Sequence, residues 1–148
     1  MAWRDIRRRE EFINEGERMN KFSAISRERL ATCDEKLQMV FQQVIKYFNC
    51  SIIEGHRGEV LQHLYFTQGK TQLDWPLGKH NKIPSEAVDV MPYPINWYDK
   101  KRMCYFAGYV MSTGLLLGIK LRWGHDWDGD TDLNDQKFND GPHYELID

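Results

Sequence analysis

With 148 residues, 41% of them hydrophobic and 13% aromatic, the chain is long enough to bury the core of one domain and too apolar for a disordered protein. The net charge is −2 and the acidic excess lies in one segment, so the positive balance elsewhere is too weak to indicate nucleic-acid binding. No apolar run is long enough for membrane insertion, and three scattered cysteines without a CxxC pair indicate reduced thiols rather than disulfides.

The first 18 residues mix arginines with acidic residues and predict a short helical extension before a single domain formed by residues 19–148. This N-terminus lacks the apolar core of a signal peptide, so we expect synthesis in the cytoplasm. We also expect a monomer.

The apolar residues that come next recur at helical spacing and predict a helix with one buried face, formed by Leu37, Val40, Phe41, Val44, Ile45 and Phe48. Thr32 and Glu35 are spaced as a capping box at the start of that helix. A short strand is expected at 51–53 and a second helix at 58–68. A polar loop then leads to a strand at 87–90.

Residues 101–117 predict a third helix, and 120–123 another strand. An acidic loop follows, and residues 143–146 predict the last strand. The fold class is therefore α+β, with helices packed on a small, mainly antiparallel sheet.

Two histidines and an aspartate are the candidate metal ligands. His80 and Asp89 flank the loop before a predicted strand, and His143 begins the last strand. Two imidazoles, one carboxylate and a water make the open tetrahedral set typical of catalytic zinc. The spacing alone leaves an alternative open, in which His80 is a solvated loop residue and His143 is a hydrogen-bonded strand residue.

Three further residues have candidate roles around such a metal. Asp140, three residues before His143, could take a proton from the metal-site water and pass it to the leaving amine. Arg57 could hold a developing oxyanion or a substrate carboxylate. Glu145 shares a strand face with His143 and could orient its ring.

The segment WGHDWDGDTDLND raises two more hypotheses. His125 is a candidate substrate contact, with a plain loop histidine as the alternative, and Trp127 could form a wall of the cleft. The alternating aspartates suit a hard cation such as Ca²⁺, although the spacing is not that of an EF-hand, and a solvated acidic loop is the default. The aspartates in question are Asp126, Asp128, Asp130 and Asp132.

The segments GKHNKIPSEAVDV, RWGHDWDGD and NDGPHYEL together resemble the zinc peptidases that include phage L-alanyl-D-glutamate endolysins, D-alanyl-D-alanine carboxypeptidases and vancomycin-resistance dipeptidases. Their pattern is Ser-x-His, then Ala-x-Asp, then an acid three residues before a final His. His80, Asp89, Asp140 and His143 fit it, and EGHRGEVLQHLYFTQGKTQ is similar to the segment that carries the family's arginine, here Arg57.

The chain departs from the pattern in three places. Gly78 stands where the pattern has serine, so a hydroxyl beside the metal loop is missing. The nine-residue step from His80 to Asp89 is similar to the phage branch rather than the dipeptidases. Asp140 replaces a glutamate, which puts the base one methylene further from the water.

The resemblance implies a phage endolysin, a zinc-dependent endopeptidase that cleaves the L-alanyl-D-glutamate bond of peptidoglycan stem peptides and reaches the wall in the periplasm after membrane permeabilisation. Two alternatives stay open. One is a D-alanyl-D-alanine carboxypeptidase in which Arg57 grips the terminal carboxylate. The other is a catalytically silent, metal-bearing cell-wall-binding module with a hedgehog-like fold.

Overall fold

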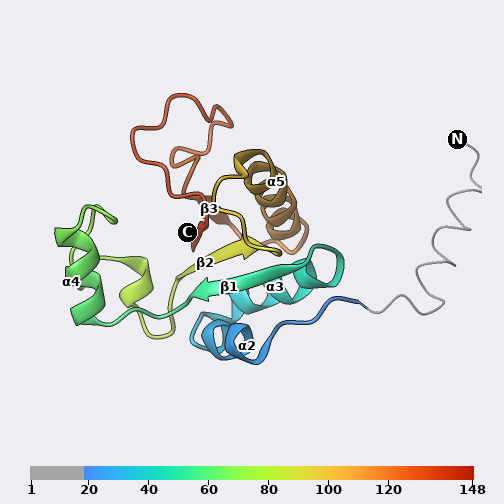
Figure 1. The fold of residues 1–148 in the computed structure, drawn as a ribbon, viewed down its shortest axis with the longest axis horizontal. Helices are drawn as coiled ribbons and strands as arrows, with labels where there is room; N and C mark the ends of the chain where they lie inside the picture. Colours follow the sequence, from blue (N-terminus) through green and yellow to red (C-terminus); the bar gives the residue numbers. More distant parts are fainter. Residues whose placement is uncertain (1–18) are drawn as a thin grey trace, which may run out of the picture.

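A computed structural model describes residues 19–148, which form a four-stranded antiparallel sheet with helices packed against it (Figure 1). In chain order the elements are α2 (Ala24–Ala31), α3 (Glu35–Tyr47), β1 (Cys50–Glu54), α4 (Glu59–Thr67), the short 3-10 helix η1 (Lys79–Asn81), β2 (Ala87–Pro92), α5 (Lys100–Leu116), β3 (Leu121–Trp123) and β4 (His143–Leu146).

The strand order β1-β2-β4-β3 places the last strand of the chain in the interior of the sheet. On the β2–β4 pair, Asp89 lies opposite His143 and Ala87 lies opposite Glu145. Because side chains alternate along a strand, these residues share one face of the sheet. The intervening pair, Val88 and Tyr144, faces the hydrophobic core.

The core lies between the sheet and the two long helices, α3 and α5. Tyr144 of β4 is fully buried, with its ring centroid 5.6 Å from that of Phe41 on α3 and 6.3 Å from that of Phe106 on α5. The apolar stripe of α3 supplies further fully buried side chains at Leu37, Val40 and Val44. This packing fixes β4, and with it the residues on its other face.

The predicted fold class is confirmed, but one local prediction is wrong. Thr32 does not cap α3: it ends α2, and its hydroxyl donates to the Arg29 carbonyl at 2.6 Å. Asp34 is the N-cap of α3, and its carboxylate accepts from the Lys36 amide at 2.9 Å. The helix α2 was not predicted, because it buries only Ser26 and Leu30 and so has little apolar periodicity.

The predicted helix over residues 1–18 lies outside the described residues. All three cysteines are free thiols, as expected. Within residues 19–148, none of the helices combines the length and the apolar character that crossing a bilayer requires.

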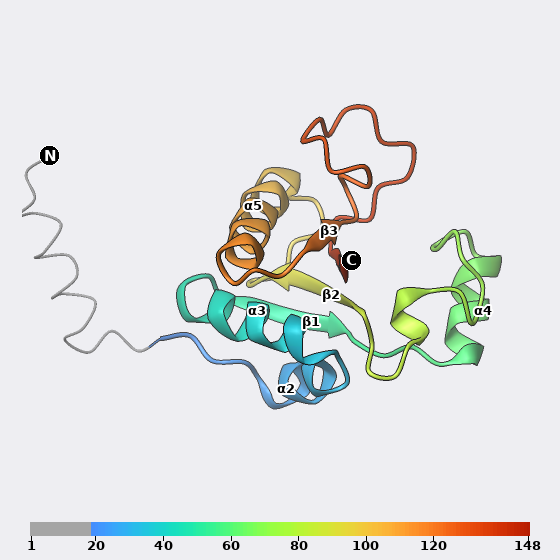
Figure 2. The same cartoon turned by 180° about the vertical axis from the view of Figure 1, so that it is seen from behind.

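Figure 2 shows α4 and the loop after it standing apart from α3 and α5, beyond the end of the sheet.

Candidate metal centre

The three candidate ligands come from three elements that the sheet brings together. His80 lies on η1, Asp89 on β2 and His143 at the start of β4, and all three side chains are buried. One ligand atom from each lies within 4.8 Å of the others. The predicted triad is therefore assembled, although 54 residues separate Asp89 from His143.

The spacing of the ligand atoms suits a small tetrahedral ion. Nε2 of His80 lies 3.1 Å from Oδ1 of Asp89 and 3.2 Å from Nδ1 of His143, and that Nδ1 lies 3.2 Å from the same oxygen. Ligands about 2.0–2.1 Å from a tetrahedral zinc are about 3.3 Å from one another. Two nitrogens and one oxygen are also a donor set that zinc accepts.

Hydrogen bonds on the far side of each ring fix the tautomers. Nδ1 of His80 lies 2.7 Å from the carbonyl oxygen of Gly55, which can only accept, so Nδ1 carries the proton and Nε2 is left with a lone pair. Nε2 of His143 lies 2.9 Å from Oε1 of Glu145, so Nε2 carries the proton and the lone pair of Nδ1 is left to bind a metal. Glu145 thus lies behind the ring of the candidate ligand His143, and its role in orienting a metal-bound ring stays a prediction.

The charges around the triad favour a cation. Burial alone would raise the pKa of Asp89, but the charges of His80 and His143 and their hydrogen bonds hold it well below its usual range. Burial opposes a charged ring at His143, yet the bonds to Asp89 and Glu145 raise its pKa to about 9. The site therefore takes up a proton where a metal would otherwise bind, so metal binding must displace a proton.

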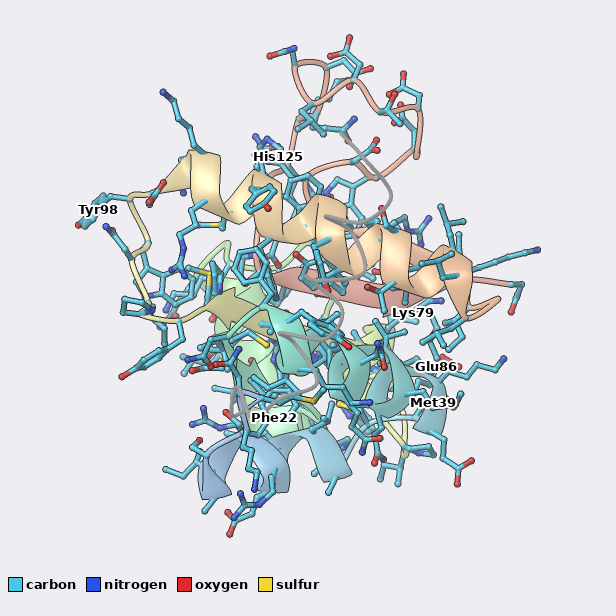
Figure 3. All side chains as sticks on the ribbon, turned by 90° about the vertical axis from the view of Figure 1, so that its right-hand side faces the viewer. Phe22, Met39, Lys79, Glu86, Tyr98 and His125 are labelled. Carbon is cyan, nitrogen blue, oxygen red and sulfur yellow. The ribbon has the colours of Figure 1, made fainter. Side chains whose placement is uncertain are left out.

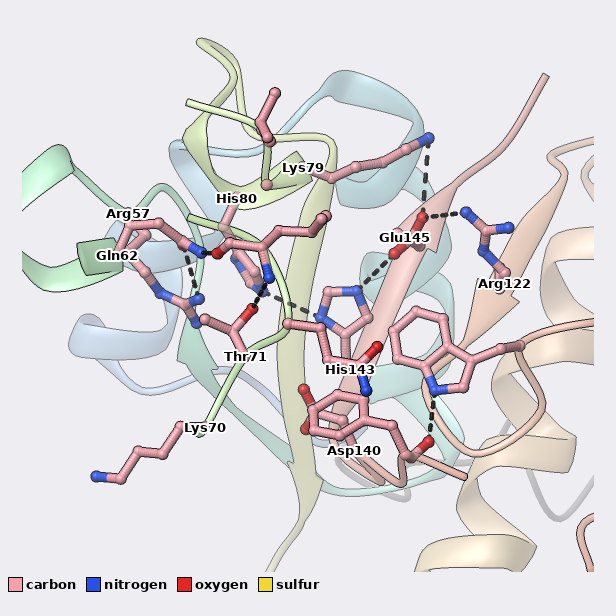
Figure 4. Close-up of a pocket in the computed structure, with 16 residues that line it drawn as sticks. Arg57, Gln62, Lys70, Thr71, Lys79, His80, Arg122, Asp140, His143 and Glu145 are labelled. Carbon is pink, nitrogen blue, oxygen red and sulfur yellow. Dashed lines mark hydrogen bonds and ion pairs between the residues drawn. The ribbon is translucent and has the colours of Figure 1, made fainter. Parts of the chain in front are cut away.

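Glu145 is itself fixed by two cations (Figure 4). Oε2 of Glu145 accepts from Nη2 of Arg122 at 2.8 Å, and Nζ of Lys79 lies 3.9 Å away. Burial would raise the pKa of Glu145, but the bonds from His143 and Arg122 lower it to about 2. The carboxylate behind His143 therefore stays ionised at neutral pH.

Arg57 lies beside the triad, with most of its donors directed at protein acceptors. Its Nε and Nη2 form a bidentate pair with Glu54 at 3.1 and 2.7 Å, and Nη1 donates to Gln62 at 3.0 Å. Nη2 also lies 3.6 Å from Oδ2 of Asp89. Burial lowers the pKa of Arg57, but Glu54 and Asp89 outweigh it, so the guanidinium keeps its charge.

Asp140 lines the same cavity, and the backbone around Gly124 holds it there. The Asp140 amide donates to the Gly124 carbonyl at 2.7 Å, and a Cβ on Gly124 would lie 2.2 Å from the Asp140 carbonyl oxygen. Only glycine allows this approach. Burial and the neighbouring Asp89 carboxylate raise the pKa of Asp140 to about 6. Such a group can take up and release a proton near neutral pH.

The cavity in front of the triad has a volume of about 450 Å³. Trp127 forms part of its wall: the indole centroid lies 5.4 Å from the His143 ring, and Nε1 donates to the Phe138 carbonyl at 2.7 Å. His125 is not among the lining residues. It packs on Trp123 at 5.2 Å, and Figure 3 shows it well apart from Lys79.

The space beside Gly78, where the family pattern has serine, is filled from elsewhere in the chain. The Gly78 amide donates to Oδ1 of Asn81 at 3.0 Å, and Nδ2 of Asn81 donates to the Arg57 carbonyl at 3.0 Å and to Oε1 of Gln62 at 3.1 Å. Sequence analysis missed Gln62 and Asn81. Their spacing from Arg57 and His80 carries no signal until the loop is folded.

The acidic loop brings together part of the predicted calcium set. Carboxylate oxygens of Asp126, Asp128 and Asp130 lie within 4.8 Å of one another, but Asp132 is outside this group. Backbone amides already satisfy several of these oxygens; Asp126, for example, accepts from Gly129 at 3.1 Å and Thr131 at 3.2 Å. Calcium binding here stays a prediction.

Comparison with known proteins agrees with this geometry. The sequence model of the phage L-alanyl-D-glutamate peptidases matches residues 19–147. The chain is 30% identical to the L-alanyl-D-glutamate peptidase of Escherichia phage T5 over 135 residues, which cover 86% of this chain and 98% of the relative. Its fold is similar to the crystal structure of the Serratia marcescens L-Ala D-Glu endopeptidase ChiX, with a TM-score of 0.70 and 25% identity over 86% of this chain and 91% of the other.

A match over nearly all described residues, with the ligand triad assembled, establishes that the chain belongs to the phage L-alanyl-D-glutamate peptidase family.

Proposed function

We propose that this chain is an endolysin, a zinc-dependent endopeptidase that cleaves the L-alanyl-D-glutamate bond of peptidoglycan stem peptides. The observation that carries the proposal is the convergence of His80, Asp89 and His143, whose ligand atoms lie within 4.8 Å of one another, in a chain whose relatives are named for this bond. We propose zinc because the ligand spacing and the mixed nitrogen and oxygen donors suit it.

The zinc would supply Lewis-acid chemistry, polarising the scissile carbonyl and lowering the pKa of a water. Asp140 is the proposed proton carrier: with a pKa of about 6 it accepts the proton of the attacking water and then donates it to the leaving amine. Arg57 keeps its positive charge within the cavity and would steady the negative charge that develops on the carbonyl oxygen.

The carboxypeptidase alternative needs a cation free to grip a terminal carboxylate. The donors of Arg57 are largely taken by Glu54 and Gln62, so Arg57 does not fit the role that this alternative gives it. The endopeptidase is favoured because the relatives are named for the L-alanyl-D-glutamate bond. We also propose that the protein acts as a monomer, because one chain supplies every proposed ligand and the proton carrier. Its target would be the cell wall.

The test is mass spectrometry of purified peptidoglycan digested with and without a chelator. The proposal expects a new D-glutamate amine and an L-alanine carboxyl end, both lost on chelation and restored by zinc. Release of D-alanine would support the carboxypeptidase instead. If wild type and Asp140→Ala both bind wall material and neither cleaves it, the chain is a binding module.

A further inference from the structure

One end of the cavity carries more positive charge than the protein neutralises. Arg122 and Lys79 both lie against a single carboxylate, Glu145, at 2.8 and 3.9 Å (Figure 4). Glu145 also accepts from His143. Two permanent cations therefore share one anion at the cavity wall, and this end can take a further negative charge.

Arg122 has donors to spare. A guanidinium has five N–H groups, and within residues 19–148 the only hydrogen bond it donates goes to Glu145. Its Nε is buried and has no acceptor among the described residues. A buried donor left in this state is costly, and such groups in native sites commonly meet water or a ligand. The guanidinium carbon lies 6.0 Å from the centroid of the Trp127 ring, beside the cavity.

We propose that Arg122 is the specificity-determining residue that binds the free carboxylate of the glutamyl residue on the amine side of the scissile bond. The inference rests on the proposed function. A glutamyl residue has two carboxyl groups and the chain continues through only one, so the other is an anion. Its carbon is two or four bonds from the scissile nitrogen, depending on which carboxyl is free.

Arg122 lies where a carboxyl group so close to the scissile nitrogen could meet it. The guanidinium contacts Glu145 at 2.8 Å, and Glu145 contacts the candidate ligand His143 at 2.9 Å. The cation is therefore one side chain away from the metal position. Trp127 lies close to both His143 and Arg122 and offers an apolar surface for the methylenes of the glutamyl side chain. A planar guanidinium also binds a carboxylate with two parallel bonds, which an ammonium cannot do.

The other cations that line the cavity are less suited. Arg57 is committed to Glu54 and Gln62. Lys79 donates to the Leu146 carbonyl, which ties η1 to β4. Lys70 stands over the Tyr65 ring at 5.2 Å, and in Figure 4 its side chain extends away from His143.

The test compares two synthetic stem peptides that differ only in this carboxyl group, one free and one converted to its primary amide. The kcat/KM of each is measured at saturating zinc, and metal content is determined for every protein. In the wild type, kcat/KM should be higher for the free acid than for the amide by on the order of 10- to 100-fold, which is the effect expected of one charge-assisted hydrogen bond. In Arg122→Gln the ratio should fall to about 1, whereas Lys79→Gln, the matched control at the same carboxylate, should keep the wild-type ratio.

The ratio is taken within one protein, so a general loss of metal or stability lowers both rates and cancels. A wild-type ratio near 1, or an unchanged ratio in Arg122→Gln, overturns the inference while leaving the proposed function intact. If wild type cleaves neither peptide, both fail. Should Arg122→Gln not fold, calorimetric binding of the acid and amide product peptides to wild type and Arg122→Lys decides: an equal preference in both proteins refutes the role.

Discussion

Restoring the serine of the family pattern at position 78 should destabilise this protein. A Cβ on Gly78 would lie 2.9 Å from Oδ1 of Asn81 and 3.3 Å from Nε2 of Gln62. Neither amide can withdraw freely: Asn81 bonds the Gly78 amide, the Arg57 carbonyl and Gln62, while Gln62 accepts from Arg57 and donates to the Leu73 carbonyl. The new side chain must therefore break part of this network.

The expected cost follows from the bonds at risk. Losing about two hydrogen bonds at about 1 kcal/mol each lowers the free energy of unfolding by about 2 kcal/mol. For a domain of this size that corresponds to a fall in Tm of roughly 4–8 °C. Backbone strain adds nothing, because φ at Gly78 is −74°. Since Gln62 holds Arg57, kcat/KM should fall as well.

The assay is thermal unfolding of zinc-loaded Gly78→Ser by circular dichroism, with Asn81→Ala and the double variant as a cycle. Asn81→Ala alone should cost about 3 kcal/mol because it removes all three hydrogen bonds of Asn81, and it also removes the atom that the serine meets first. The double variant should therefore be little worse than Asn81→Ala. A Tm that rises in Gly78→Ser, or two strictly additive losses, would refute this account of the loop.

Three further outcomes are expected. Asp140→Asn should retain its metal and lose about 10²- to 10⁴-fold in kcat. The wild-type rate should rise with pH through about 6 as Asp140 ionises, and this rise should be absent from the variant. Stopped assays on peptidoglycan, together with metal analysis, check both outcomes. Glu145→Gln should bind zinc roughly 10- to 100-fold more weakly in competition with a chromophoric chelator. Because the pKa of Glu145 is lowered from 4.5 to about 2, its contribution to stability is present above pH 4.5 and is lost as the pH falls towards 2, so urea midpoints should depend less on pH in Glu145→Gln. Chelation should lower the Tm of wild type, and added zinc should restore it, whereas His143→Ala should show little response to either.

The sequence predicted the long helix α3, which has strong apolar periodicity, and missed the short helix α2, which lacks it. The stripe of α3 was visible because Leu37, Val40 and Phe41 recur at helical spacing and are buried. The helix α2 exposes most of its side chains and presents no such stripe. The capping error had a local cause: Thr32 fits the capping box, but Asp34 takes the cap position.

At the site, the metal ligands could be predicted from residue types, whereas the contacts around them depend on strand register and could not. His80, Asp89 and His143 could be chosen because few side chains bind metals, and the family pattern fixed which ones. The partnership of Arg122 with Glu145 depends on the pairing of β3 with β4, which sequence spacing does not determine. Gln62 likewise acquires its role only when α4 brings it against Arg57.

The direct opposition of Asp89 and His143 on neighbouring strands has a consequence for folding. A slip of one residue between β2 and β4 would turn His143 to the core face and bring Tyr144 opposite Asp89. An ion shared by the two side chains is compatible with a single alignment of the strands. A bound metal would thus stabilise only the correct register of β2 and β4 as the sheet assembles.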